Sequence, residues 1–153
     1  MSTDPESFRT DVRIAFEVGQ LALRRPLRSG SVVVIVSSGA GLGGSPLSGG
    51  YAGAKRTQMF LAGYLQSASD AAQLGVRFVA LVPRQLIEGT DIGKAAARGY
   101  SEQAGISEEK FMERFGAPLT TGVAARAILD IARGEVGGGA TVLGLTGKGV
   151  EAL

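Results

Sequence analysis

The chain has 153 residues, 44% of them hydrophobic, and its 16 basic and 14 acidic residues leave a formal net charge of +2. These values are typical of one domain with its own core, and the scattered basic residues do not favour a nucleic-acid surface. Cysteine and histidine are absent, which excludes disulfides, Ser-His-Asp hydrolases and metal sites with nitrogen or sulfur ligands, so we predict no metal site. No segment approaches the ~18 apolar residues that a membrane span needs, and the N-terminus has no leader pattern, so we expect a cytoplasmic protein.

The first part of the chain predicts a helix followed by a strand. Asp4-Pro5-Glu6 is typical of a helix start, and Pro26 with Gly30 ends the helical spacing, which predicts a helix over residues 5–27. Residues 32–36 are five β-branched residues without polar alternation, which favours a parallel strand covered on both faces. Three arginines precede this strand, and we expect them at a helix end rather than at a phosphate site: Arg24, Arg25 and Arg28.

The middle of the chain predicts a strand, a loop, a helix and a second strand. Residues 37–50 are rich in Gly, Ser and Pro, and a helix is expected to follow from about Tyr51 to about Leu74. A second apolar strand is expected over 76–82, so that residues 32–82 form one βαβ unit.

The last part of the chain predicts three shorter helices and a third strand. They are a short helix over 94–105, a helix from Ser107 to about Phe115, a helix that Thr120 or Thr121 caps and that ends near Arg133, and a strand over 141–145. Alternating strands and helices predict an α/β fold, a Rossmann-like three-layer αβα arrangement with a short, mostly parallel sheet, in one domain over residues 1–153.

The glycine-rich loop fits the pattern of a dinucleotide phosphate loop, but its context does not. Gly39 to Gly44 read G-x-G-x-x-G after a strand. Residues 45–50 separate this run from the next helix, so that helix would not point its N-terminal amides at a phosphate, and no acidic residue ends the next strand. We interpret the run as a flexible loop that borders a site.

Tyr51 and Lys55 lie one helical turn apart, so their side chains share a face. An ammonium ~4 Å from a phenol favours the phenolate by at most ~4 kcal/mol at an effective dielectric of ~20, since desolvation opposes it. Lysine could thus make tyrosine a usable acid or base, although such a pair alone is usually a solvated surface. Ser38 ends the first strand, at the edge where open α/β sheets bind ligands and where the Tyr51 helix begins. We predict that the three groups converge.

These residues carry a resemblance to a known family. The segment GSVVVIVSSGAG, the spacing of thirteen residues from Ser38 to Tyr51, the sequence YAGAK and a strand ending in Pro83 resemble the catalytic segment of the short-chain dehydrogenase/reductases. The resemblance covers nearly the whole chain. It implies that Ser38 hydrogen-bonds the substrate oxygen, that Tyr51 is the general acid/base, and that Lys55 binds the nicotinamide ribose and promotes ionisation of the tyrosine.

The resemblance also implies a cofactor, NAD or NADP, which Tyr51, Lys55, Pro83 and Thr90 would contact. The family usually has P-G-x-x-x-T after that strand, whereas here Arg84 replaces the glycine and the threonine comes late. Many members support the lysine with an asparagine in the preceding helix, and the alignment places Arg13 there.

Only the C-terminal half of the family pattern is present. The opening strand, the T-G-x-x-x-G-x-G turn and the residue that selects NAD or NADP would precede residue 1. We therefore expect a truncated doubly wound sheet that lacks its N-terminal strands, leaves residues 32–36 with a bare apolar edge, and binds the cofactor weakly. The chain is expected to self-associate or to pair with a complementing chain, without nucleic-acid or membrane partners.

Three functions remain open. The first is an NAD(P)-dependent oxidoreductase that interconverts an alcohol and a ketone or aldehyde, incomplete without the N-terminal half. The second is a catalytically degenerate homologue that serves as an oligomerisation or binding subunit, because the helices at 5–27 and 51–74 resemble the pair that forms family dimers. The third is a hydrolase-like or isomerase variant that uses Ser38 and Tyr51 without nicotinamide. The enzymatic hypotheses require Ser38 and Tyr51 on one side of the sheet, and Lys55 free of any unrelated carboxylate. A lid over 86–116 indicates only a moderately apolar substrate.

Overall fold

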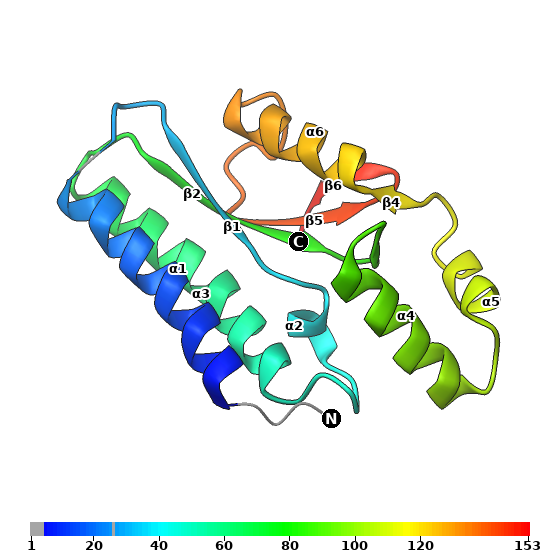
Figure 1. The fold of residues 1–153 in the computed structure, drawn as a ribbon. Coiled ribbons are helices and arrows are strands. Elements are labelled where there is room, and N and C mark those ends of the chain that lie inside the picture. The colour runs from blue at the N-terminus through cyan, green and yellow to red at the C-terminus, as the bar shows by residue number, and fades with distance from the viewer. Residues whose placement is uncertain (1–4, 26) are drawn as a thin grey trace.

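One four-stranded sheet organises the structure, a computed structural model that describes residues 5–25 and 27–153 (Figure 1). The strand order is β1-β2-β5-β6, in which the first three strands are parallel and the last is antiparallel. The strands are β1 (Val32–Val36), β2 (Arg77–Pro83), β5 (Val142–Thr146) and β6 (Gly149–Ala152). The predicted short, mostly parallel sheet is thereby confirmed.

Helices cover both faces of this sheet (Figure 1). On one face α1 (Pro5–Arg24) packs against α3 (Gly49–Ala71), and on the other lies α6 (Thr121–Ala132). Each face of the sheet has its own hydrophobic core. Leu65 and Phe78 are fully buried on the α1–α3 side, and Ile131 and Leu143 are fully buried on the α6 side. The predicted three-layer α/β arrangement is therefore confirmed. None of the helices in the described ranges is long and apolar enough to cross a bilayer.

The α1–α3 contact depends on a glycine. A Cβ atom built on Gly19 would lie 2.4 Å from Leu65 Cδ1, far closer than two carbon atoms can approach. A side chain at position 19 would therefore force the fully buried Leu65 side chain to shift. The glycine thus allows α1 to pack closely against the C-terminal half of α3.

The helix ends differ from the prediction by a few residues. Helix α1 ends at Arg24, and the predicted cap Asp4 and terminator Pro26 lie outside the described residues. Helix α3 ends at Ala71 rather than near Leu74, because the chain turns through positive φ at Gln73 (52°) and at Gly75 (65°).

A lid-like segment follows β2. It contains β3 (Ile87–Glu88), α4 (Asp91–Ala104), α5 (Glu108–Glu113) and β4 (Leu119–Thr120). Helix α4 begins before the predicted residue 94, because the Thr90 hydroxyl accepts a hydrogen bond from Gly93 N–H at 3.0 Å and caps it. The predicted caps Ser107 and Thr120 are confirmed. Strands β3 and β4 pair in parallel over two residues and give no periodic signal in the sequence.

Strand β1 forms one end of the sheet, as the sequence analysis expected. It is not covered on both faces throughout, because the exposed fraction is 8% at Ile35 but 48% at Val36. Val32, Val33 and Val34 are half-buried, so Ile35 alone of this strand is buried, and the prediction of a strand covered on both faces is wrong.

Candidate functional site

A cleft with a volume of about 760 Å³ opens where β1 and β2 end. Ser38, Tyr51, Lys55 and Pro83 all line it, together with the start of the lid segment. The cleft thus brings together four of the five residues that the sequence analysis singled out, and the two proposed catalytic oxygens border the same space. Thr90, the fifth, does not line it.

The two adjacent serines have different roles. Ser37 is buried, and its hydroxyl donates to the Lys55 carbonyl at 2.7 Å, which ties the end of β1 to α3. Ser38 borders the cleft, and its hydroxyl oxygen accepts from Ala40 N–H at 3.3 Å. That contact leaves the Ser38 hydroxyl proton for a ligand. Ser37 also lines the cleft, but its hydroxyl proton is used by the Lys55 carbonyl, so Ser38, thirteen residues before Tyr51, is the serine that can donate to a ligand.

Tyr51 and Lys55 share a face of α3, as their spacing predicts. The Lys55 ammonium lies 5.3 Å from the centroid of the Tyr51 ring. Tyr51 is partly exposed at the cleft, whereas the Lys55 side chain is only 11% exposed. The structure thus places a positive charge beside the Tyr51 ring at the cleft.

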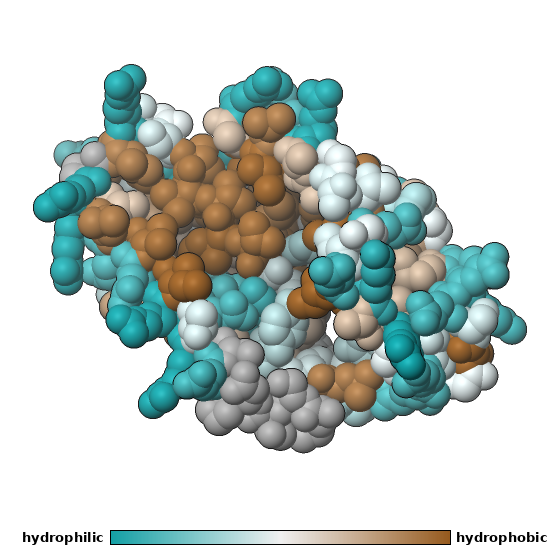
Figure 2. Space-filling view, viewed as in Figure 1, coloured by the Kyte–Doolittle hydropathy of each residue, from teal (hydrophilic) through white to brown (hydrophobic). Residues whose placement is uncertain are grey.

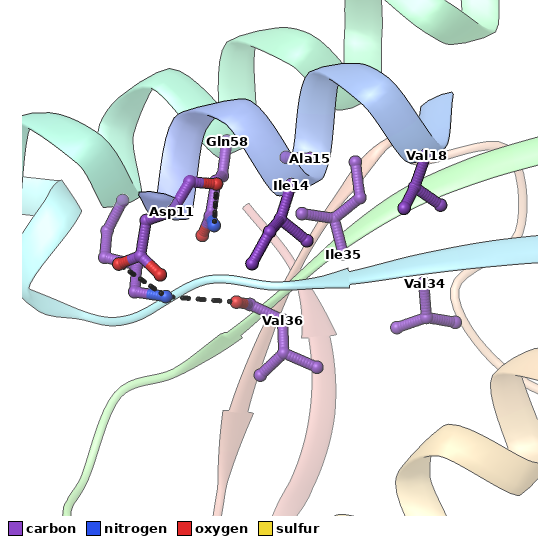
Figure 3. A pocket seen from close by; sticks show the side chains of 9 residues that line it. Asp11, Ile14, Ala15, Val18, Val34, Ile35, Val36 and Gln58 are labelled. Atoms are coloured by element: carbon purple, nitrogen blue, oxygen red, sulfur yellow. Dashed lines mark hydrogen bonds and ion pairs between the residues drawn. The ribbon is translucent and has the colours of Figure 1, made fainter. Parts of the chain in front are cut away.

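Lys55 also has a carboxylate partner (Figure 3). Its ammonium lies 3.3 Å from Asp11 Oδ2, on α1, and 3.5 Å from the Val36 carbonyl oxygen. The requirement that Lys55 be free of a carboxylate is therefore not met, which weighs against the enzymatic hypotheses, although Lys55 still lines the cleft beside Tyr51. The negative charge of Asp11 partly offsets the positive charge that Lys55 places beside the Tyr51 ring.

Arg13 does not take the place beside the lysine that the alignment gave it. It pairs with Glu17 at 2.7 Å on the outer side of α1, where its side chain is 76% exposed. The hydrogen bond and the charge of Glu17 raise the pKa of the Arg13 guanidinium. Residues two apart on a helix point to nearly opposite sides, and Asp11 is the one that reaches Lys55. No sequence pattern signals this contact between distant residues.

Gln58 supports Asp11 from the next turn of α3. Its Nε2 donates to the Asp11 carbonyl at 3.0 Å, and its Oε1, which is buried, has no partner in the described part of the chain. Gln58 is 5% exposed. This glutamine was missed in the sequence, because a polar residue within a helix pattern does not reveal its partner.

Side chains of the lid close one side of the cleft. The hydroxyls of Ser45 and Tyr100 lie 2.6 Å apart and join the glycine loop to α4. Gln85 Nε2 donates to the carbonyls of Phe115 at 2.9 Å and Ala117 at 3.1 Å, while its Oε1 accepts from Gly147 N–H. Gln85 therefore joins the end of β2, the lid and the β5–β6 turn. These contacts are long-range, and the sequence analysis did not identify them.

The glycine run packs against backbone. A four-residue helix, α2 (Ala40–Gly43), begins within it, contrary to the prediction that no helix starts there. A Cβ atom on Gly39 would lie 3.0 Å from the Pro83 carbonyl oxygen, and one on Gly41 would lie 2.8 Å from Arg56 N. These two glycines are thus required for close packing onto β2 and α3. The run borders the cleft through Gly39, Ala40 and Gly44, and the preference for this interpretation over a phosphate loop stays a prediction.

The described residues fit one end of a nicotinamide cofactor. The cleft volume lies within the ~300–1,000 Å³ typical of small-molecule sites, and Tyr51, Lys55 and Pro83 line it. Two glycines of the run, Gly39 and Gly41, are used for packing instead. Thr90 donates its hydroxyl to the Ile87 carbonyl at 2.8 Å and caps α4, so its contact with the cofactor stays a prediction.

Comparison with solved structures places this arrangement among known folds. Sorbitol-6-phosphate 2-dehydrogenase SrlD from Erwinia amylovora superposes with a TM-score of 0.70 at 19% sequence identity, over 96% of this chain and 60% of that one. That enzyme is a short-chain dehydrogenase/reductase. The chain shares part of the fold of this dehydrogenase. The resemblance noted in the sequence is confirmed at this level, and the chain spans 60% of the length of the dehydrogenase. No protein-family model and no curated protein matches it.

Proposed function

We propose that the chain carries the catalytic part of an NAD(P)-dependent oxidoreductase that interconverts an alcohol and a ketone or aldehyde. One observation carries the proposal: Ser38, Tyr51 and Lys55 line the same cleft at the carboxyl ends of parallel strands. Open α/β sheets bind their ligands at this edge. The overlay on a dehydrogenase supports the same class of reaction.

Each of these residues has a chemical role in the proposed reaction. The Ser38 hydroxyl donates a hydrogen bond to the substrate oxygen and orients it. In alcohol oxidation the Tyr51 oxygen takes the hydroxyl proton, and in the reverse direction it returns that proton to the carbonyl oxygen. Lys55 places a positive charge beside the Tyr51 phenol and would contact the nicotinamide ribose, and Asp11 partly offsets that charge. A bound nicotinamide supplies or accepts the hydride at the substrate carbon.

The cleft supports a substrate that is apolar around its reacting oxygen. Among the described residues that line it there is no Asp or Glu, and its lid side carries Leu47, Ile87, Ile92 and Phe115. The proposed catalytic hydroxyls of Ser38 and Tyr51 line the same cleft, as do the polar side chains of Arg84, Gln85 and Tyr100. An alcohol or ketone with an apolar substituent fits this mixed lining.

Cofactor affinity should be weak in this chain alone. Much of the affinity of a dinucleotide comes from contacts to its diphosphate and adenosine, for which the described residues offer no cradle at Gly39 or Gly41. We propose that tight binding needs a further segment, such as the part of the dehydrogenase that the overlay leaves uncovered.

The second candidate function is a non-catalytic association subunit. The Asp11–Lys55 pair favours it, because a lysine paired with a carboxylate places less net positive charge beside the Tyr51 phenol. The stacked and exposed pair Phe60 and Tyr64 on α3, 71% and 55% exposed, offers an apolar contact surface. If the chain has this role, loss of the Tyr51 hydroxyl should leave its function unchanged.

Hydride transfer with a matched pair of tyrosine variants separates the two candidates. Oxidation of NADH and NADPH at millimolar concentration is followed with a panel of apolar ketones and aldehydes. Tyr51→Phe should lower kcat/KM by about 10²–10⁴-fold, whereas Tyr64→Phe, on the same helix but outside the cleft, should leave it unchanged. Equal rates for the two variants, or no turnover with either cofactor, would favour the association subunit.

A further inference from the structure

The free edge of β1 presents hydrogen-bonding groups that no strand of the described chain uses. Ser37 N–H donates to Leu81 O, and Ser31 O accepts from Arg77 N–H, so the odd-numbered residues face β2. Alternation along a strand then points the N–H and C=O groups of Val32, Val34 and Val36 to the open edge. Only the Val36 carbonyl has a described partner there, the Lys55 ammonium at 3.5 Å, and a carbonyl can accept a second bond.

The surroundings of this edge are apolar on both sides. Figure 2 shows a continuous hydrophobic area over β1, between α1 and α6. A groove of about 240 Å³ runs between α1 and β1, and Figure 3 shows Ile14 and Val18 on one side of the strand and Val34 and Val36 on the other. The exposed fractions are 57% for Ile14, 51% for Val18 and 48% for Val36. A strand that binds here must therefore be apolar on both faces.

Strand β1 itself has this composition. Natural edge strands are usually protected by lysine, proline or a bulge, and VVVIV has none of them. If two copies pair antiparallel about Val34, Val32 of each faces Val36 of the other. The backbone N–H and C=O groups of Val32, Val34 and Val36 then all have hydrogen-bond partners in the other copy. Only valine and isoleucine side chains are in contact across the junction.

Electrostatics favours the antiparallel over the parallel arrangement. The exposed Arg24, Arg25 and Arg28 lie at the N-terminal end of β1, whereas Asp11 lies beside Val36 at its C-terminal end. Antiparallel pairing places the arginines of the two copies at opposite ends of the junction, each set facing the neutral Asp11–Lys55 pair of the other copy. Parallel pairing would bring the arginines together.

We propose that the edge of β1 and the groove beside it bind a second copy of this chain, with the two β1 strands antiparallel about Val34 in one continuous sheet. The two-fold axis is normal to the sheet, so the same patch serves both copies and the assembly closes as a dimer. The groove ends at Asp11 and Lys55, which places the dimer contact beside the lysine of the candidate site. The proposal does not depend on the proposed reaction.

Single-cysteine variants test the register, since the natural chain has no cysteine. In an antiparallel pair centred on Val34, the two Val34 Cα atoms lie ~5.5 Å apart, within the range a disulfide can bridge. Mild oxidation of Val34→Cys should give a covalent dimer on a non-reducing gel. Val36→Cys lies on the same strand, but the substituted positions of the two copies are too far apart to form a disulfide, so it should give much less covalent dimer. Phe60→Cys, on the exposed face of α3, should also give much less.

The oligomeric state of the 153-residue chain provides the second measurement. Sedimentation should show a monomer–dimer equilibrium, and Val34→Pro should raise the dimer dissociation constant by at least about tenfold. This proline removes only an N–H that points to the open edge, so circular dichroism should show an unchanged fold. A monomer at all concentrations, open-ended aggregates, or a dimer cross-linked by Phe60→Cys but not by Val34→Cys would overturn the proposal.

Discussion

The Lys55 ammonium lies 3.3 Å from the Asp11 carboxylate, and this contact joins α1 to the helix that carries Tyr51. Both side chains are largely shielded, at 11% and 29% exposed. An ion pair of this kind holds the ammonium in one place, close to the phenol ring and to the cleft. The same pair therefore sets the position of Lys55 and limits the net charge that acts on Tyr51.

Removal of the Asp11 charge should destabilise the fold, because Lys55 is left largely buried without its partner. For Asp11→Asn we expect a loss of unfolding free energy between the ~1 kcal/mol typical of exposed pairs and the ~3 kcal/mol seen for buried ones. Urea denaturation measures it. Glu17→Gln, which breaks the exposed Arg13–Glu17 pair on the same helix, is the control and should change stability by less than about 0.5 kcal/mol. Equal effects of the two substitutions would show that the Lys55 contact is no stronger than a surface pair.

The two neighbouring serines should separate activity from stability. Ser38→Ala should leave unfolding nearly unchanged and lower kcat/KM about 10²-fold, because it removes a donor to the substrate oxygen. Ser37→Ala should destabilise by about 0.5–1.5 kcal/mol, since it breaks the buried bond to the Lys55 carbonyl. Turnover and urea denaturation of both variants provide the measurement. If Ser37→Ala lost activity while Ser38→Ala kept it, the assignment of the cleft-facing serine would be wrong.

The glycines of the loop should differ in their tolerance of a methyl group. Gly41→Ala places a Cβ atom 2.8 Å from the backbone of α3 and should cost about 1–3 kcal/mol. Gly43→Ala has nothing within 4 Å of its Cβ and should be neutral or slightly stabilising. Thermal unfolding of the two variants tests this, and similar melting temperatures would contradict the packing role of Gly41.

Gln85 should determine how firmly the lid is held. Gln85→Ala removes contacts to the carbonyls of Phe115 and Ala117 and to the N–H of Gly147. We expect faster amide exchange and proteolysis in residues 115–120, with a loss of about 1–3 kcal/mol from unsatisfied groups. Gln103→Ala, an exposed glutamine of α4, is the matched control. Unchanged exchange after Gln85→Ala would mean that the lid does not depend on this side chain.

Much of the fold could be predicted from local pattern. The apolar run of β1 and the caps at Ser107 and Thr120 are properties of a few neighbouring residues, and the structure confirms them. Strand β6 and the short strands β3 and β4 were not predicted, because two to four residues show no clear alternation. Helix α2 was missed for a related reason, since its stability comes from contact with α3 rather than from its own sequence.

The candidate site was predictable only where its residues are close in sequence. Tyr51 and Lys55 share a helix, and Ser38 ends the neighbouring strand, so their convergence on one cleft follows from spacing and topology. Asp11 and Lys55 are in contact although they are 44 residues apart in the sequence. Such a contact is set by helix packing, which the spacing of residues does not encode, and the alignment placed Arg13 there instead.

Binding of the two forms of a nicotinamide ligand tests the central claim most directly. Saturation-transfer NMR would compare reduced nicotinamide mononucleotide, which lacks adenosine, with NADH, for the natural chain and for Lys55→Met. The account predicts weak binding of similar strength for both ligands, because only the nicotinamide and ribose meet described residues, and its loss in Lys55→Met. Absence of binding by the natural chain, or binding that Lys55→Met leaves unchanged, would contradict it.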